Sequence, residues 1–236
     1  KGYSQNSMYT WAIKDGGGQN DIVDELVLDD YDNIYVTGYY EGNGIFGSNL
    51  LPSNGSNNVF FAKYDNSGNC IWAKAPTEGY SAEGEGIALG GNGSLYCTGF
   101  FSGYPVFGND TLAADGGYNT FITCLDLGGN YIWTSFMHGS EIVARDITAD
   151  NAGNCYVTGY FDDEFYYNDY HYQSPAWSGT EMFVLKIDPE GNLIWLAATE
   201  NVAGGSVYSK SIEVDSYNNV YVTGNVNGNV NFGSNN

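Results

Sequence analysis

The sequence Tyr35-Val36-Thr37-Gly38 returns three times, as Tyr96-Cys97-Thr98-Gly99, Tyr156-Val157-Thr158-Gly159 and Tyr221-Val222-Thr223-Gly224. Its four glycines, Gly38, Gly99, Gly159 and Gly224, are 61, 60 and 65 residues apart. Four tryptophans keep the same period, with spacings of 61, 61 and 62 residues: Trp11, Trp72, Trp133 and Trp195. An aromatic residue follows each of the glycines by eight positions: Phe46, Phe107, Tyr167 and Phe232. These three markers recur with the same period, which shows that the 236-residue chain is an array of repeats.

Each repeat predicts four β-strands. The first strand alternates apolar residues, as at Leu26 and Leu28, and the second carries the Tyr-x-Thr-Gly sequence. The third, at residues 59–64 in the first full repeat, is aromatic and β-branched, and the fourth, at residues 71–74, holds the tryptophan. Alternation with a period of two and enrichment in such residues are typical of half-buried strands.

The turns are predicted by residues that tolerate a left-handed backbone. Between the first and second strands one position is always Gly, Asn or Asp, and between the third and fourth strands it is always Gly. An Asp three residues before this Gly can hydrogen-bond the turn backbone. The positions are Asp32, Gly93, Gly153 and Asn218 in the first turn and Gly68, Gly129 and Gly191 in the second.

A four-stranded antiparallel unit cannot bury both of its faces alone, and stacking the units face to face solves this. We therefore predict an all-β fold of β-propeller type, with three complete blades and one split blade. The whole chain, 1–236, forms one repeat region whose units are 1–20 (partial), 21–79, 80–139, 140–203 and 204–236 (partial). The tryptophans and the Tyr-x-Thr-Gly glycines are the predicted repeat core, with the indoles packed between blades.

The repeats resemble a bacterial family. Residues 33–39, 60–65 and 67–74 are similar to the SBBP-type β-propeller repeat, roughly GNxYVTG…FVAKYDxxGNxxWxK. The resemblance covers nearly the whole chain and implies a propeller in secreted or cell-surface proteins, with no catalytic residues. Cys97 and Cys124 replace the usual Val and Lys, and Gly90 stands where other repeats have Asp. We expect these departures to alter local packing only.

Composition excludes several functions. The chain has 7 basic and 28 acidic residues, a net charge of −21, and Arg145 is its one arginine. Nucleic acid and anionic membrane surfaces are therefore disfavoured as partners. No apolar run reaches the 18 or more residues of a membrane-spanning helix, so no membrane insertion is expected. Low lysine and abundant Asn, Gly and Tyr fit an extracellular, secreted protein.

The four cysteines leave three disulfide pairings open. They are Cys70, Cys97, Cys124 and Cys155, and none belongs to a CxxC sequence or to a zinc spacing. Four small strand residues without disulfides are the favoured interpretation.

Catalytic and metal sites are weakly indicated. The histidines are His138, expected in an inter-blade loop, and His171, and no nucleophile sequence such as GxSxG occurs. An enzyme is disfavoured, and a glycoside hydrolase, which needs two opposed carboxylates in a channel, is the remaining enzymatic alternative. No cofactor is predicted. Calcium is the one weak metal candidate, at the turn cluster Asp29, Asp30 and Asp32, where a turn-forming role competes.

Residues 160–172 form the most distinctive local segment, rich in tyrosine and acid. Aromatic faces beside carboxylates suit carbohydrate binding, whereas an outer hairpin with cross-strand aromatic pairs is the structural alternative. The candidate ligand-contacting residues are Asp162, Asp163, Tyr166, Tyr167, Tyr170 and His171.

The leading function is a non-enzymatic extracellular module for adhesion, display or assembly at the cell surface. Protein partners or self-association are expected, because the terminal blade is incomplete. Its strands near residues 208–230 could pair with the strand at residues 9–14, either within the chain or between chains. The alternatives are a self-assembling fibre or surface-layer subunit joined by strand complementation, and a carbohydrate-binding propeller. A fragment of a longer repeat protein would show the same pattern.

Overall fold

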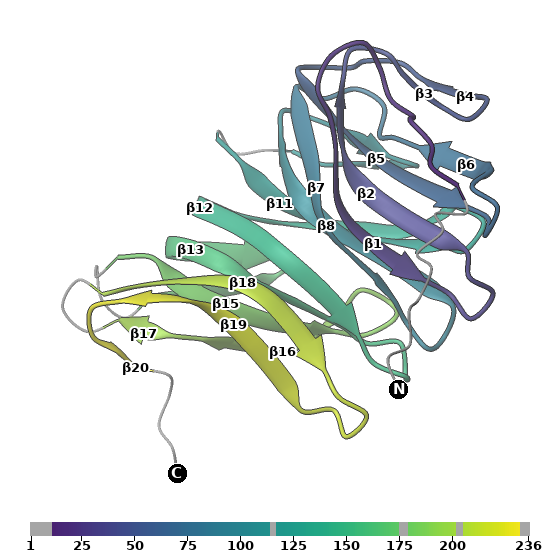
Figure 1. The fold of residues 1–236 in the computed structure, drawn as a ribbon. Coiled ribbons are helices and arrows are strands. Elements are labelled where there is room, and N and C mark those ends of the chain that lie inside the picture. The colour runs from purple at the N-terminus through teal and green to yellow at the C-terminus, as the bar shows by residue number, and fades with distance from the viewer. Residues whose placement is uncertain (1–10, 114–116, 175–178, 202–204, 232–236) are drawn as a thin grey trace, which may run out of the picture.

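The computed structural model describes residues 11–113, 117–174, 179–201 and 205–231, and the chain is all-β throughout these ranges. The strands form four-stranded antiparallel blades that follow one another in chain order (Figure 1). The first strands of successive blades contact each other and lie innermost, β1 (Asp21–Leu28) against β7 (Ser81–Leu89), β7 against β12 (Tyr131–Ala149), and β12 against β18 (Ser206–Val214). No helix in the described ranges is long and apolar enough to cross a membrane.

Blade I is complete. Its strands pair in the order β1, β2 (Ile34–Glu41), β5 (Asn57–Tyr64) and β6 (Cys70–Lys74). The connection between the second and third strands carries the small hairpin of β3 (Gly44–Phe46) and β4 (Asn49–Leu51).

Blades II and III share one continuous sheet. Blade II contains β7, β8 (Ser94–Ser102), β11 (Asn119–Asp126) and the start of β12; blade III contains the rest of β12, β13 (Cys155–Tyr167), β15 (Glu181–Ile187) and β16 (Leu193–Ala198). The outer pieces are β9 (Val106–Phe107), β10 (Asp110–Thr111) and β14 (Tyr170–Gln173). His138, expected in a loop, lies within β12, because this strand passes from one blade to the next without a break.

Blade IV is half a blade within the described residues. It consists of β18 and β19 (Val220–Asn227), flanked by the short pair β17 (Glu200–Asn201) and β20 (Val230–Asn231). Blade I and blade IV lie at opposite ends of the array (Figure 1). Residues 11–15 do not pair with β18 or β19; the adjoining Gly16 bridges Ile45 of blade I, and residues 9 and 10 lie outside the described residues.

The left-handed turn residues are confirmed. Asp32 and Asn218 have φ angles of 59° and 64°, and Gly68, Gly129 and Gly191 have φ angles of 85°, 80° and 89°. Each Asp opening these turns accepts hydrogen bonds from backbone N–H groups two and four residues later, as Asp65 does from Ser67 and Asn69.

Glycine is required in the Tyr-x-Thr-Gly sequence for a different reason, the close approach of another strand. A Cβ on Gly38 would lie 2.0 Å from the carbonyl oxygen of Ile22, and one on Gly99 would lie 2.0 Å from that of Glu83. Gly159 and Gly224 meet first-strand carbonyls in the same way. The register of the first strand shifts beside each contact, so this glycine lets the second strand approach a bulge.

Candidate interaction surfaces

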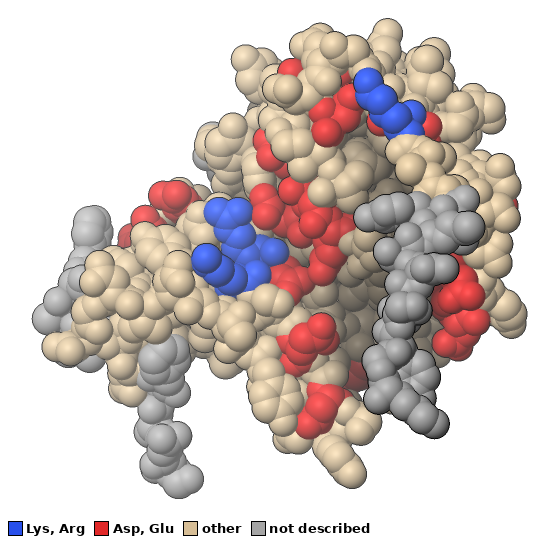
Figure 2. Space-filling view, viewed as in Figure 1, with Lys and Arg blue, Asp and Glu red and all other residues tan. Residues whose placement is uncertain are grey.

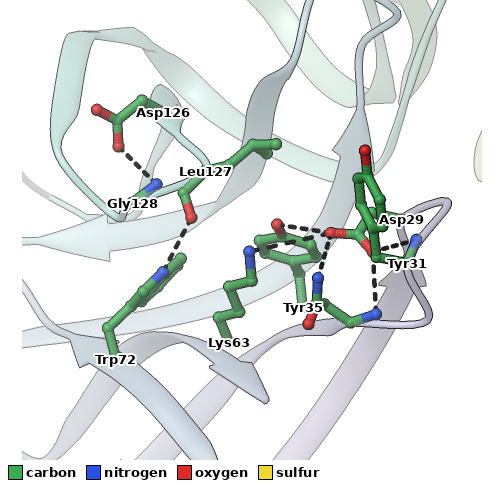
Figure 3. Close-up of polar contacts among 9 residues, drawn as sticks. Asp29, Tyr31, Tyr35, Lys63, Trp72, Asp126, Leu127 and Gly128 are labelled. Atoms are coloured by element: carbon green, nitrogen blue, oxygen red, sulfur yellow. Dashed lines mark hydrogen bonds and ion pairs between the residues drawn. The ribbon is translucent and has the colours of Figure 1, made fainter. Parts of the chain in front are cut away.

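A tryptophan holds blade I to blade II, and another holds blade II to blade III. The indole Nε1 of Trp72 on β6 donates a hydrogen bond of 3.1 Å to the carbonyl oxygen of Leu127, in the turn of blade II between its third and fourth strands (Figure 3). Trp11 donates to Asn66 at 2.9 Å and Trp133 to Pro189 at 2.8 Å, so the contact repeats along the array.

The glycine of that turn makes room for the indole. A Cβ on Gly129 would lie 2.8 Å from the ring of Trp72, and Gly68 and Gly191 meet Trp11 and Trp133 in the same manner. All three described turns of this type therefore already hold a tryptophan. Trp195 is 37% exposed, and its Nε1 has no hydrogen-bond acceptor among the described residues.

A second repeated cluster joins strands within a blade. In blade I the Oδ1 of Asp29 accepts hydrogen bonds from the N–H groups of Tyr31 and Asn33, and its Oδ2 accepts them from the Asn33 side chain and the Tyr35 hydroxyl (Figure 3). The Nζ of Lys63 lies 3.9 Å from this Oδ2 and 4.8 Å from the centre of the Tyr35 ring. Burial opposes ionisation of Asp29, but these hydrogen bonds outweigh it and keep the pKa of the carboxyl below its usual value.

Blade III repeats the cluster and blade II lacks it. Lys186 lies 3.5 Å from Asp150 and 4.8 Å from the centre of the Tyr156 ring. In blade II Gly90 and Cys124 occupy the Asp and Lys positions, and the Tyr96 hydroxyl donates instead to the Gly153 carbonyl at 2.6 Å. The two departures thus remove both partners of one ion pair, which goes beyond the local packing change expected from the sequence.

Blade IV has this cluster without its lysine. The Tyr221 hydroxyl donates to Oδ2 of Asp215 at 3.1 Å, as in the complete blades. Tyr221 is 56% exposed, whereas Tyr35 and Tyr96 are 0% exposed and Tyr156 is 1% exposed. The difference arises because β19 pairs with β18 on one side and with no described strand on the other.

The calcium candidates lie in the first turn of blade I. Both carboxylate oxygens of Asp29 are used by the turn, and Asp32 takes the left-handed position. Among the described residues no group of three or more His, Cys, Asp or Glu side chains, with or without Asp30, is arranged to hold a metal ion.

Charged side chains line the innermost strands. Asp24, Glu85, Arg145 and Lys210 occupy the bulge of each first strand, and Figure 2 shows acidic side chains gathering near the middle of this face beside basic ones. The Arg145 guanidinium lies 3.2 Å from the Glu85 carboxylate. The neighbouring acids bind backbone, since Glu25 accepts from the Ile87 N–H and Asp146 from the Ile212 N–H, each at 2.7 Å.

Burial is the main cause of the raised pKa values of two of these acids. Burial raises the pKa of Glu25 to about 7, aided by the Asp146 and Glu213 carboxylates and opposed by the Ile87 N–H. Burial likewise raises the pKa of Asp24, with help from Glu83. The sequence alone does not show that Glu83 lies near Asp24 or that Glu85 pairs with Arg145.

The tyrosine-rich segment forms the outer hairpin of β13 and β14. Tyr166 is stacked between the two histidines, with ring centroids 5.0 Å from His138 and 4.3 Å from His171. His171 Nε2 also lies 2.9 Å from a carboxylate oxygen of Glu164. Both faces of Tyr166 are therefore covered, while Tyr170 is exposed at the hairpin tip.

The remaining residues of this set have different roles. Tyr167 is fully buried and its hydroxyl donates to the Gly191 carbonyl, so its prediction as a ligand-contacting residue is wrong. It occupies the same repeat position as the buried Phe46 and Phe107, a signal already present in the sequence. Asp163 has a φ of 65° and accepts from the Gln173 side chain, and Asp162 is half-buried on β13.

The four cysteines are free thiols in this structure. Cys97, Cys124 and Cys155 are buried in the blades, and Cys70 is half-buried. Burial raises the pKa of Cys124 to about 11, so this thiol stays protonated at neutral pH.

Both ends of the array expose apolar surface. Beside blade I, Trp11, Ile22, Leu26 and Phe60 border a groove of about 390 Å³. At the other end Tyr221 and Val226 of β19 are exposed. Among the described residues, the contacts between blades I, II and III are therefore occupied, and apolar side chains are exposed beside blades I and IV.

Comparison with known proteins agrees with the fold. No protein-family model matches the chain. The chain is 24% identical, over 240 residues, to a protein described as an uncharacterized WD repeat-containing protein, L264, of Acanthamoeba polyphaga mimivirus. The match covers 86% of this chain and 17% of the viral protein, so the chain spans less than a fifth of that protein's length. The similarity supports a β-propeller-like repeat chain, and no family model supports the narrower SBBP assignment.

Proposed function

We propose that this chain is a non-enzymatic interaction module whose β-propeller blades present a binding edge at blade IV. The observation that carries the proposal is the exposure of Tyr221, 56%, against 0% or 1% for its three counterparts. An open strand edge offers unpaired backbone N–H and C=O groups to a further strand. The well-formed Asp215 turn holds this edge in the conformation of the complete blades.

The bonding of the innermost carboxylates favours a scaffold over a hydrolase. Glu25 and Asp146 each accept a backbone N–H of the next blade, and Glu85 pairs with Arg145. Glycoside hydrolysis needs one acid and one base free to face a substrate from opposite sides. Similarity to a protein described as WD repeat-containing supports a scaffold of repeats.

The finer proposal places the module outside the cell, for adhesion, display or assembly at the cell surface. It rests on the strong negative charge, the low lysine content and the likeness of the repeats to the SBBP type. Detection of the native chain on the surface of intact cells would support it, and confinement to the cell interior would contradict it.

Site-specific photo-crosslinking tests the binding edge. A photoreactive residue at Thr223, on the open edge of β19, should give covalent adducts with another polypeptide. The matched control is Tyr217, which is 85% exposed but lies in a turn. Equal adduct yields at the two positions, or none at Thr223, would contradict the proposal.

Self-assembly is the second candidate, favoured by the apolar groove beside Trp11 at the opposite end of the array. Joining blade IV of one copy to blade I of the next would cover both ends and form a head-to-tail chain. Light scattering over a range of concentrations should then show growing oligomers, whereas a constant monomer mass would exclude this route.

Carbohydrate binding is the third candidate, and its surface is smaller than the sequence indicated. Tyr170 and His171 are exposed beside Glu164 and remain able to contact a sugar, whereas Tyr166 has no free face. Tyr170→Ala should abolish binding on a glycan array if this candidate holds, with Tyr217→Ala as the matched exposed control.

A further inference from the structure

A pocket of about 370 Å³ lies where the turns between the first and second strands of blades I, II and III meet. We propose that it binds a neutral hexose, with the ring of Tyr31 as the stacking surface and the side chains of Asp30 and Asn151 as hydrogen-bonding groups. This site goes beyond the interaction module proposed above and uses no residue of β19. It is also separate from the Tyr170 hairpin, because β13 runs from the Asp150 turn at one end to that hairpin at the other.

The pocket owes its space to two glycines in blade II. Gly90 and Gly91 line it and begin the turn of this blade. The other blades carry polar side chains at the same two positions: Asp29 and Asp30, Asp150 and Asn151, and Asp215 and Ser216. The backbone of the turn is kept, since the Gly93 N–H donates to the Gly90 carbonyl at 2.9 Å. The missing side chains therefore leave space without altering the turn.

A close contact with blade III fixes the position of these glycines. The N–H of Gly91 donates to the carbonyl of Asp150 at 3.2 Å, and a Cβ on Gly91 would lie 2.4 Å from the carbonyl oxygen of Asn151. Glycine allows this approach, so the turn of blade II is held against that of blade III. Leu89 and Leu127 of blade II, both half-buried, supply the apolar lining of the pocket.

The polar groups of the pocket have unused hydrogen-bonding capacity. The side chains of Asp30 and Asn151 have no hydrogen-bond partner among the described residues. The N–H of Asn92, in the turn of blade II, has no acceptor among them either. The equivalent N–H groups of Tyr31 and Ala152 donate to the Asp of their own turns, at 2.9 and 3.0 Å. A carboxylate, an amide and a free N–H supply both the acceptors and the donors that sugar hydroxyls need.

Tyr31 supplies the aromatic surface. Its side chain is 81% exposed, whereas its N–H is held by the Asp29 carboxylate at 2.9 Å. The backbone that carries the ring is therefore fixed while the ring itself is open to a ligand; Tyr31 and Asp29 are drawn with Leu127 in Figure 3. A ring with an apolar face and a polar hydroxyl suits the C–H face of a hexose and its neighbouring hydroxyl groups.

Charge favours a neutral sugar over an acidic one. The carboxylates of Asp29 and Asp150 are each compensated by a lysine, Lys63 at 3.9 Å and Lys186 at 3.5 Å. Asp30 has no cation within ion-pair distance among the described residues. The pocket therefore carries an excess of negative charge, which repels the carboxylate of a uronic acid.

Saturation-transfer NMR on the full chain tests the site, with the methyl glycosides of glucose, galactose and mannose as probes. At least one of them should bind, with a dissociation constant of about 1 mM, as expected for a ligand of about a dozen non-hydrogen atoms. The amide signals of Asp30, Tyr31 and Gly91 should shift during the titration. The matching uronic acid should bind about fivefold more weakly, the effect of one carboxylate a few ångströms away across water.

Three variants assign the binding to this pocket. Tyr31→Ala should weaken it by about tenfold or more. Tyr217→Ala changes the same position in the turn of blade IV, where the side chain is 85% exposed, and should leave the binding unchanged. Asp30→Asn keeps an oxygen acceptor and removes the charge, so the hexose should still bind and the uronic acid should bind nearly as well. All three residues are exposed in turns, so the variants should keep the melting temperature of the parent chain.

Several outcomes would overturn the proposal. Failure of all three glycosides to bind, equal losses for Tyr31→Ala and Tyr217→Ala, or equal binding of hexose and uronic acid by the parent chain would each contradict it. Binding of n-butylammonium in place of the glycosides would assign the pocket to a cation and would overturn it equally. None of these results bears on the binding edge of blade IV, which Thr223 crosslinking tests on its own.

Discussion

Replacing Trp72 by phenylalanine should loosen blade I from blade II. The change removes the 3.1 Å hydrogen bond from the indole to the Leu127 carbonyl, worth about 1 kcal/mol. It also removes part of the apolar area that the ring buries against Gly129, worth about 1 kcal/mol at 25 cal/mol per Å². The expected loss in free energy of unfolding is about 2 kcal/mol, or a melting temperature lower by about 4–8 °C.

Calorimetry of purified variants measures this loss, and Trp195 supplies the matched control. Its indole has no acceptor among the described residues and is 37% exposed, so Trp195→Phe should cost about 0.5 kcal/mol. Equal losses for the two variants would refute the idea that the tryptophans stabilise the array through the turn of the next blade.

Three further changes test other parts of the structure. Gly129→Ala should lower the free energy of unfolding, measured in urea, by about 2–3 kcal/mol, because the new Cβ would meet Trp72 and the φ angle is positive. Gly93→Ala is the control: this glycine has a similar φ angle and no neighbour within 4 Å of its Cβ position, so the loss should be about 1 kcal/mol. Folding raises the pKa of Glu25, so the contribution of this residue to stability is fully present below about pH 4.5 and is lost as the pH rises to about 7. After allowance for solvent screening, the free energy of unfolding should fall by about 1 kcal/mol over this range. Glu25→Gln should flatten this pH dependence when melting is measured at several pH values. Lys186→Met should cost about 1–2 kcal/mol, and a loss below 0.3 kcal/mol in melting experiments would contradict the proposed ion pair and cation–π contact.

Local patterns made the blades predictable from sequence. Three kinds of residue make a contact that recurs once per repeat: the turn glycines, the Tyr-x-Thr-Gly glycines and the tryptophans. Their spacing alone therefore located the strands. Strand continuity was less visible: β12 runs through the position of His138, where a loop was expected, because nothing in the sequence marks its passage between blades. Tyr167 was misread because its acidic neighbours suggested a surface, although its repeat position is a core position.

The interaction surfaces depend on contacts between distant strands. Asp24, Glu85, Arg145 and Lys210 each precede the Tyr-x-Thr-Gly glycine by 14 residues, yet their convergence follows only from the packing of the first strands. The pairing of Asp with Lys across a blade was likewise hidden, although its joint loss in blade II was a readable signal.

The central claim is that β19 is a complete second strand with no third strand beside it among the described residues. Amide hydrogen exchange of the isolated chain, followed strand by strand, tests it most directly. The outward-pointing amides of Val220–Asn227 should exchange much faster than those of β2, β8 and β13. Slow exchange across β19 in the isolated monomer, at the rate of the other three strands, would contradict the claim.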